Sequence, residues 1–140
     1  NANAFNMFAG YYREGVRGMP QDFAKANELY LKAGELGCAG AYYNVGNSYR
    51  NGEGVEVDMK KAKHFYELAA INGNVEARYN LGVMEGKAGN YQRAMKHFIL
   101  AAKAGFKQSL DAVKEGFITG YVTKDEYENT LRTLRKFKMR

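Results

Sequence analysis

The chain lacks the sequence features that disulfides, membrane-spanning helices and metal sites require. Its 140 residues include one cysteine, one proline and no tryptophan. Because Cys38 stands alone, no intramolecular disulfide can form, and we expect this thiol to be a small packing residue. No uninterrupted apolar run approaches the ~20 residues that cross a bilayer. The two histidines, His64 and His97, have no metal-ligand partner one turn away, so we expect no metal and no other cofactor.

The first residues, NANAFNMFAG, lack the basic and apolar segments of a signal peptide. They also lack an initiator methionine and begin inside a repeat of the chain, which suggests a fragment or a processed protein. The single cysteine and the absence of a visible signal peptide favour an intracellular location, in the cytoplasm, the nucleus or an organelle.

The charge is positive and unevenly distributed. The formal net charge is +6, and half of it lies from Lys124 onward. A basic tail favours acidic proteins, nucleic acid or an anionic membrane as partners. A solvated polar face on a terminal helix explains the tail as well, and we prefer that interpretation. The basic residues of the tail are Lys124, Arg132, Arg135, Lys136, Lys138 and Arg140.

The main feature of the sequence is an internal repeat. Gly37, Gly73 and Gly105 are separated by 36 and then 32 residues. The same two spacings separate Ala26, Ala62 and Ala94; Tyr30, Tyr66 and Phe98; and Ala33, Ala69 and Ala101. Four markers in one register indicate a repeated structural unit. The units run over about residues 3–38, 39–74, 75–106 and 107–140, within one expected domain of residues 1–140.

Each unit has the pattern of a helix hairpin. Small and apolar residues from Ala41 to Tyr49 follow the spacing of one helix face. After a glycine-rich break, Asp58 is expected to cap a second helix, and Gly73 to end that helix in a left-handed conformation. One hairpin cannot bury its apolar face alone, so neighbouring hairpins must share a core.

Two glycines are expected in the middle of helices, where each costs about 1 kcal/mol relative to alanine. Because Gly46 and Gly82 hold the same position in their units, they predict that another helix passes too close for a β-carbon. Ala26, Ala62 and Ala94 are expected to allow the same close approach from the second helices.

Residues 39–73 resemble the Sel1-like repeat, a relative of the tetratricopeptide repeat. Segments such as AKANELYLKAGELG are also similar to the expanded Sel1-like families of unicellular algae such as diatoms. The resemblance implies an all-α, right-handed α-α superhelical solenoid of about three and a half Sel1-like, TPR-like hairpins. The residues that carry it are Ala41, Val45-Gly46, Tyr49, Gly52-x-Gly54-Val55, Asp58, Lys61-Ala62, Tyr66, Ala69-Ala70 and Gly73.

The last unit departs from the repeat. Lys114 replaces the glycine of the first helix, and the second helix opens with Thr123-x-x-Glu126, the pattern of a capping box. Apolar residues from Tyr127 to Leu134 lie on one face of that helix, with basic residues between them. We therefore interpret the unit as a C-terminal cap with a polar outer side.

No catalytic motif is present in the sequence. Neither Ser48 nor Ser109 begins a Ser-x-x-Lys motif. The loop GEGVEVD is expected between two helices and is not followed by the lysine of a phosphate-binding loop. We therefore expect that the protein is not an enzyme.

The resemblance implies a non-enzymatic protein–protein interaction adaptor or scaffold, which binds a protein or peptide in a concave groove lined by the first helices. In this interpretation Asn47 and Asn51 hold an extended peptide while Tyr43 and Tyr79 supply contact area. The favoured alternative is that both tyrosines pack between adjacent first helices. Asn44 and Asn80 also recur, through either inter-repeat hydrogen bonds or ligand contact. The candidate partner-binding residues are Asn6, Tyr43, Asn47, Arg50, Asn51, Tyr79, Val83 and Lys87.

A second function fits the same pattern. The chain could be a structural subunit of a large assembly, held through its convex face and basic C-terminal helix. Nucleic acid is an unlikely partner, because the inward positions of the first helices change character from unit to unit.

Overall fold

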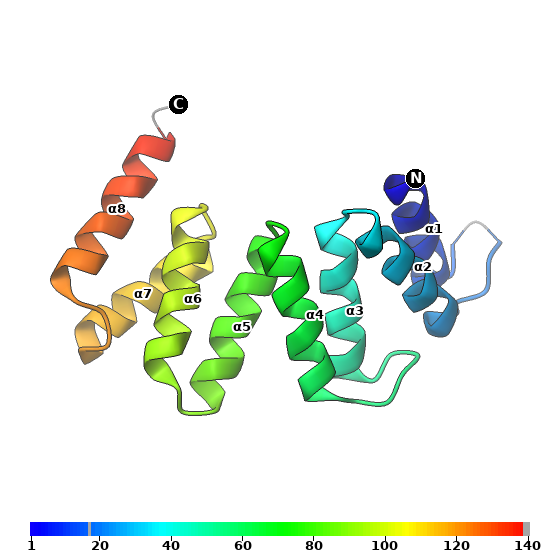
Figure 1. The fold of residues 1–140 in the computed structure, drawn as a ribbon, viewed down its shortest axis with the longest axis horizontal. Coiled ribbons are helices and arrows are strands. Elements are labelled where there is room, and N and C mark those ends of the chain that lie inside the picture. Colours follow the sequence, from blue (N-terminus) through cyan, green and yellow to red (C-terminus); the bar gives the residue numbers. More distant parts are fainter. Residues whose placement is uncertain (17, 139–140) are drawn as a thin grey trace. The chain divides into compact units, whose positions relative to one another are not determined.

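The computed structural model describes residues 1–16 and 18–138, and all regular secondary structure within them is helical. Arg140 and the side chain of Lys138, both part of the expected basic tail, lie outside this description. The helices are α1 (Ala2–Glu14), α2 (Phe23–Glu35), α3 (Ala39–Asn51), α4 (Met59–Ile71), α5 (Val75–Lys87), α6 (Tyr91–Lys103), α7 (Lys107–Thr119) and α8 (Lys124–Lys138) (Figure 1).

Consecutive helices pair into hairpins. α1 packs against α2, α3 against α4 and α5 against α6, and further contacts join α2 to α3 and α6 to α7. The contacts divide the chain into two compact units, Asn1–Asn74 and Val75–Arg140. This division falls between the second and third repeats of the sequence. A single domain over residues 1–140 stays a prediction.

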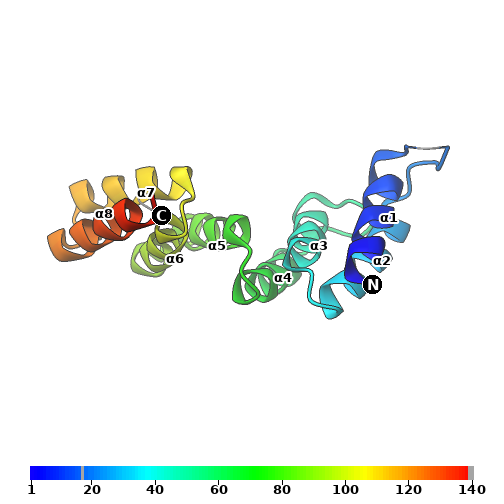
Figure 2. The ribbon, with the colours of Figure 1, turned by 90° about the horizontal axis from the view of Figure 1, so that it is seen from above.

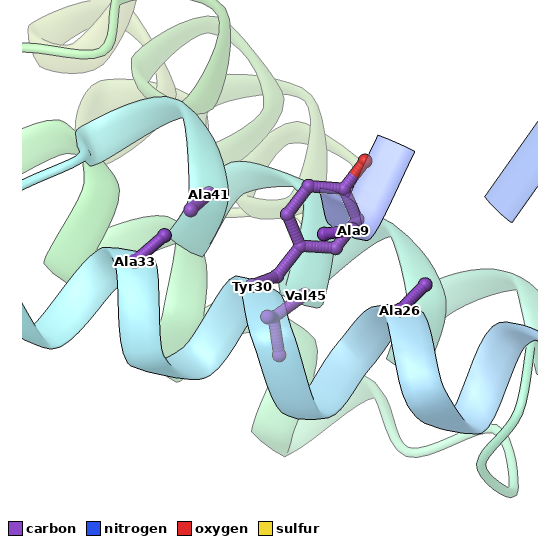
Figure 3. Close-up of a cluster of buried hydrophobic side chains, with 6 residues drawn as sticks. All are labelled: Ala9, Ala26, Tyr30, Ala33, Ala41 and Val45. Carbon is purple, nitrogen blue, oxygen red and sulfur yellow. The ribbon is translucent and has the colours of Figure 1, made fainter. Parts of the chain in front are cut away.

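The core of the first unit joins helices of both its hairpins. Its buried residues are mostly alanines, which let the helices approach closely, and Tyr30 is the one large ring among them (Figure 3). The expectation that neighbouring hairpins share a core is confirmed for this unit. The six residues are Ala9 of α1, Ala26, Tyr30 and Ala33 of α2, and Ala41 and Val45 of α3.

The mid-helix glycines face aromatic rings. A β-carbon on Gly46 would lie 2.7 Å from the ring of Tyr66, and one on Gly82 would lie 2.6 Å from the ring of Phe98. The predicted close approach is confirmed, and at Gly46 the backbone carbonyl of Ala62 on α4 also lies within 3.3 Å of the added β-carbon. The alanines expected to allow close approach, Ala26, Ala62 and Ala94, are at most 1% exposed.

The predicted helix ends are confirmed. The Asp58 carboxylate accepts a hydrogen bond from the Lys61 amide at 3.1 Å. Gly73 has a φ of 98°, in the left-handed region. The Glu126 amide donates to the Thr123 hydroxyl at 3.1 Å, and the Thr123 amide donates to the Glu126 carboxylate at 2.9 Å. These reciprocal bonds form the capping box at the start of α8.

In the second unit, α7 lies beside both α6 and α8 (Figure 2). Tyr127, Leu131 and Leu134 of α8 are half-buried, and Thr130 between them is fully buried. Arg132 is exposed, as is Arg135, so the predicted polar outer side of α8 is confirmed for these side chains.

Candidate partner-binding surface

The candidate residues lie on the first helices of the hairpins. In the first unit, Tyr43, Asn47, Arg50 and Asn51 follow one another along one face of α3, at helical spacing. Asn6 lies on α1. In the second unit, α5 carries Tyr79, Val83 and Lys87 at the same spacing. The two sets are described separately below.

Both tyrosines pack against the second helix of their own hairpin. The ring of Tyr43 is half-buried, with its centroid 5.9 Å from that of Tyr66 on α4. The ring of Tyr79 lies 5.4 Å from Phe98 on α6 and 5.2 Å from Phe106, the N-cap residue of α7. The expected packing between adjacent first helices is therefore found for Tyr79, whose ring contacts Phe106 at the start of α7. The ring of Tyr43 instead contacts Tyr66 of the second helix α4.

Asn47 is buried and holds its own hairpin together. Its side-chain oxygen accepts a hydrogen bond from the Tyr66 hydroxyl at 2.5 Å. That oxygen is therefore already paired within the hairpin, and the burial of the residue restricts its access to a partner. The equivalent positions of the next hairpin are Val83 and Phe98, an apolar pair in which Val83 packs against the core of the second unit.

Three candidate residues present their side chains to solvent. Arg50 and Asn51 are exposed in the last turn of α3, and Lys87 is exposed at the end of α5. Asn6 differs from them, because its carboxamide oxygen is enclosed and accepts no hydrogen bond within the described residues. Among the candidate residues, only Arg50, Asn51 and Lys87 thus combine a place on a first helix with an exposed side chain.

A polar network that sequence reasoning missed joins the two hairpins of the first unit. The Arg13 guanidinium donates to the Asn44 side-chain oxygen at 3.0 Å and lies 3.5 Å from the Glu53 carboxylate. Of the two explanations for the recurring asparagine, the inter-repeat hydrogen bond is therefore correct for Asn44.

A second part of this network anchors the glycine-rich loop after α3. The Ser48 hydroxyl donates to the Asn27 side-chain oxygen at 2.7 Å, and the Asn27 amide group donates to the Glu53 carbonyl at 2.9 Å. Both side chains are buried. The sequence did hold a signal for this anchor, because each is a polar residue inside an otherwise small and apolar helix face.

Tyr30 lies at the edge of the network. Burial raises the pKa of its hydroxyl, and the positive charge of Arg13 together with a hydrogen bond from its side chain opposes this rise. Since the usual tyrosine pKa of ~10 is already above neutral pH, the hydroxyl stays protonated under ordinary conditions.

The described residues offer little for other kinds of site. They contain no helix long and apolar enough to cross a membrane. They also contain no group of three His, Cys, Asp or Glu side chains placed to hold a metal ion.

Comparison with known proteins identifies the family. The Sel1 repeat model matches residues 4–38, 39–74 and 75–106. The chain therefore belongs to the Sel1 repeat family, a non-catalytic protein-interaction scaffold type.

Two solved structures share the fold. A Sel1 repeat protein from Oxalobacter formigenes is 27% identical, with a TM-score of 0.83 over 95% of this chain and 56% of that one. A protective antigen of uropathogenic Escherichia coli with an SLR fold is 28% identical, with a TM-score of 0.81 over 97% of this chain and 30% of that one. The expected fold class, an α-α solenoid of Sel1-like hairpins, is thereby confirmed.

Curated relatives come from several kingdoms. An exopolysaccharide production negative regulator of Rhizobium meliloti is 30% identical over 71% of this chain. An ERAD-associated E3 ubiquitin-protein ligase component of Arabidopsis thaliana is 31% identical over 69%, and chitin synthase regulatory factor 3 of Schizosaccharomyces pombe is 27% identical over 97%. The chain spans only 38%, 15% and 15% of these relatives, in the same order.

Proposed function

We propose that this chain is a protein–protein interaction adaptor, which binds a protein or peptide on the exposed surface of its first helices without any covalent step. Family membership supports the general class. Two of the curated relatives are named as regulators and one as a component of a ubiquitin ligase. These names are consistent with a role in protein–protein interaction.

One observation carries the choice of surface. Arg50, Asn51 and Lys87 are exposed polar side chains at the C-terminal ends of first helices whose remaining candidate residues are fixed by packing. A rigid support lowers the entropy cost of binding, because few side chains must be ordered when the partner arrives. In each unit the support behind the exposed side chains is already organised, through the contact of Tyr43 with Tyr66 in the first unit and of Tyr79 with Phe98 in the second.

The chemistry of the exposed groups suggests the kind of partner. A guanidinium and an ammonium donate hydrogen bonds and accept none, and a carboxamide both donates and accepts. Each of these groups can donate hydrogen bonds to the main-chain carbonyl groups of an extended peptide. In this proposal the first helices bind an extended polar segment through its main-chain carbonyl groups, and the rings packed behind the exposed side chains support them.

The test is affinity capture with a matched control. The binding variant is Arg50→Ala/Asn51→Ala/Lys87→Ala, in which every replaced side chain is exposed on a first helix. The control is Lys60→Ala/Glu67→Ala/Lys96→Ala, equally exposed but on the second helices α4 and α6. We expect the binding variant to lose partners that the wild type and the control retain, with all three proteins equally helical. Partners captured equally by all three would refute the first-helix surface.

The exposed apolar side chains of the second helices favour one alternative, a structural subunit held in a larger assembly. Ile71 of α4 is 76% exposed and Leu100 of α6 is 52% exposed. An assembly partner could cover such groups. Light scattering during gel filtration separates the two functions, because an adaptor should be monodisperse alone and an obligate subunit should aggregate.

A further inference from the structure

We propose that the second unit carries a further binding site, a pocket at its turns that takes an acidic segment of a partner protein. The pocket has a volume of about 350 Å³ and is distinct from the first-helix surface. We call it the turn pocket. It is lined by Gly89, Asn90, Tyr91, Gln92, Arg93 and Tyr121.

Two turns that are distant in sequence build the turn pocket. Residues 89–93 connect α5 to α6 and begin α6, and Tyr121 lies in the connection between α7 and α8. Both turns lie at the lower end of the second unit in Figure 1. The pocket thus depends on the packing of two successive hairpins, and every residue that lines it is exposed.

A pair of tyrosines forms its aromatic wall. The ring centroids of Tyr91 and Tyr121 lie 5.1 Å apart, with an angle of 39° between the planes. Despite this contact the two residues stay 46% and 44% exposed. Tyrosine gives a large contact area for the ordering of only two torsion angles, which is why it is frequent at binding hot spots. The exposed faces of the two rings can therefore pack against an apolar side chain of a partner.

The charge of the lining points to the partner. Arg93 is the only charged side chain in it, and Arg93 takes part in no ion pair among the described residues. One carboxylate is hydrogen-bonded to the lining: that of Glu85, which is buried and accepts a hydrogen bond from the Asn90 amide group at 2.9 Å. A free guanidinium binds a carboxylate through two parallel hydrogen bonds. An Asp or Glu side chain is the complementary group.

These observations define one occupant, an extended peptide segment with an acidic residue next to an apolar one. Its carboxylate pairs with Arg93, and the neighbouring side chain lies on the tyrosine pair. Single-stranded nucleic acid also combines anionic groups with flat rings. It is the less suitable occupant, because a track of several cations is needed to follow a phosphate backbone and only one lines this pocket.

The experiment measures fluorescence anisotropy with three labelled probes: a peptide that alternates glutamate with leucine, the same peptide with lysine in place of glutamate, and oligothymidylate. We expect the full chain to bind the acidic peptide at least about tenfold more tightly than either other probe. Equal affinity for the two peptides, or tighter binding of oligothymidylate, would overturn the proposal.

Variants locate the binding. We expect Arg93→Gln and Tyr121→Ala each to weaken binding of the acidic peptide by about tenfold. Lys96→Gln, an equally exposed change further along α6, should leave the affinity unchanged. The variant Arg50→Ala/Asn51→Ala/Lys87→Ala should also retain the acidic peptide. If this variant lost the peptide and Arg93→Gln kept it, the probe would bind the first helices and the turn pocket would be excluded, while the proposed adaptor function would stand.

Discussion

At the scale of single residues, a missing β-carbon lets α3 and α4 approach each other. The ring of Tyr66 occupies the space that a side chain on Gly46 would need. We expect Gly46→Ala to destabilise the fold by about 1–3 kcal/mol, because the strain of overpacking exceeds the gain of up to ~1 kcal/mol in helix propensity. Urea unfolding followed by circular dichroism measures the change.

Gly40, also on α3, provides the matched control. A β-carbon there would meet nothing within 4 Å. The variant Gly40→Ala should therefore be neutral or more stable, by up to about 1 kcal/mol. If both alanine variants shifted the unfolding midpoint upward, the close approach at Gly46 would not exist.

The hydrogen bond between Tyr66 and Asn47 gives a second prediction. Tyr66→Phe removes the donor and leaves the buried Asn47 oxygen unpaired, which should cost about 1–3 kcal/mol. The next hairpin has Phe98 and Val83 at these positions, so Tyr66→Phe/Asn47→Val copies a pair that the protein already uses. We expect the double variant to recover part of the loss in urea unfolding. A double variant less stable than Tyr66→Phe alone would contradict this.

The role of Asn47 shows why site residues are harder to predict from sequence than core residues. The repeat pattern predicts the position of Asn47 on the first helix, and the resemblance to the Sel1-like repeat implies that this position lies on a binding surface. Its burial and its bond to Tyr66 depend on a hydroxyl that reaches across from another helix. Periodicity gives the face of a helix and does not give the contacts of a particular oxygen.

At the scale of elements, the buried Asn27 of α2 holds the loop after α3 by a hydrogen bond. Asn27→Ala would leave the Ser48 hydroxyl and the Glu53 carbonyl without this partner. We expect a loss of about 1–3 kcal/mol and faster amide hydrogen exchange in residues 52–57. Mass spectrometry of peptic fragments measures the exchange.

A control for this change is Glu28→Ala, one position along α2. Glu28 is exposed, and its ion pair with Lys25 is 3.6 Å long and solvent-accessible. This variant should leave exchange in the loop unchanged. Faster exchange throughout the first unit for Asn27→Ala, without concentration in the loop, would indicate that the residue does not act as a local anchor.

The ends of the helices were the structural features best predicted from sequence. Asp58, Gly73 and the pair Thr123 and Glu126 were assigned from local chemistry alone, and each has the expected geometry. Capping needs only residues within one turn, so the sequence contains the information. The Arg13 network was missed for the opposite reason, because its members come from two hairpins and an intervening loop.

At the scale of the molecule, the repeats depend on one another for their cores. Ala41 and Val45 of the second hairpin are buried in a cluster with Tyr30 and Ala33 of α2. A peptide of residues 39–74 alone exposes this face, and helices of 13 residues are marginal in isolation. We expect the peptide to be mostly unfolded by circular dichroism and residues 1–74 to be helical with a cooperative thermal transition. A fully helical, cooperatively melting 39–74 peptide would contradict the shared core.

Recurrence in the sequence was sufficient to predict the fold class, because four marker positions repeat in one register. It did not predict which candidate residues remain accessible. Tyr43 and Tyr79 are half-buried and Asn47 is buried, whereas Arg50, Asn51 and Lys87 are exposed. The exposure of a side chain depends on which residues of the neighbouring helix lie against it. The repeat pattern gives only the residues that all units share at each position.

The adaptor proposal depends on partner contact through the first helices. Photo-crosslinking tests it directly, with benzoylphenylalanine placed at Arg50 or Lys87 and, as the control, at Lys60 or Lys96 on second helices. We predict that positions 50 and 87 each crosslink a partner protein and that positions 60 and 96 do not. Crosslinks from the second helices alone would contradict the account and favour the assembly subunit.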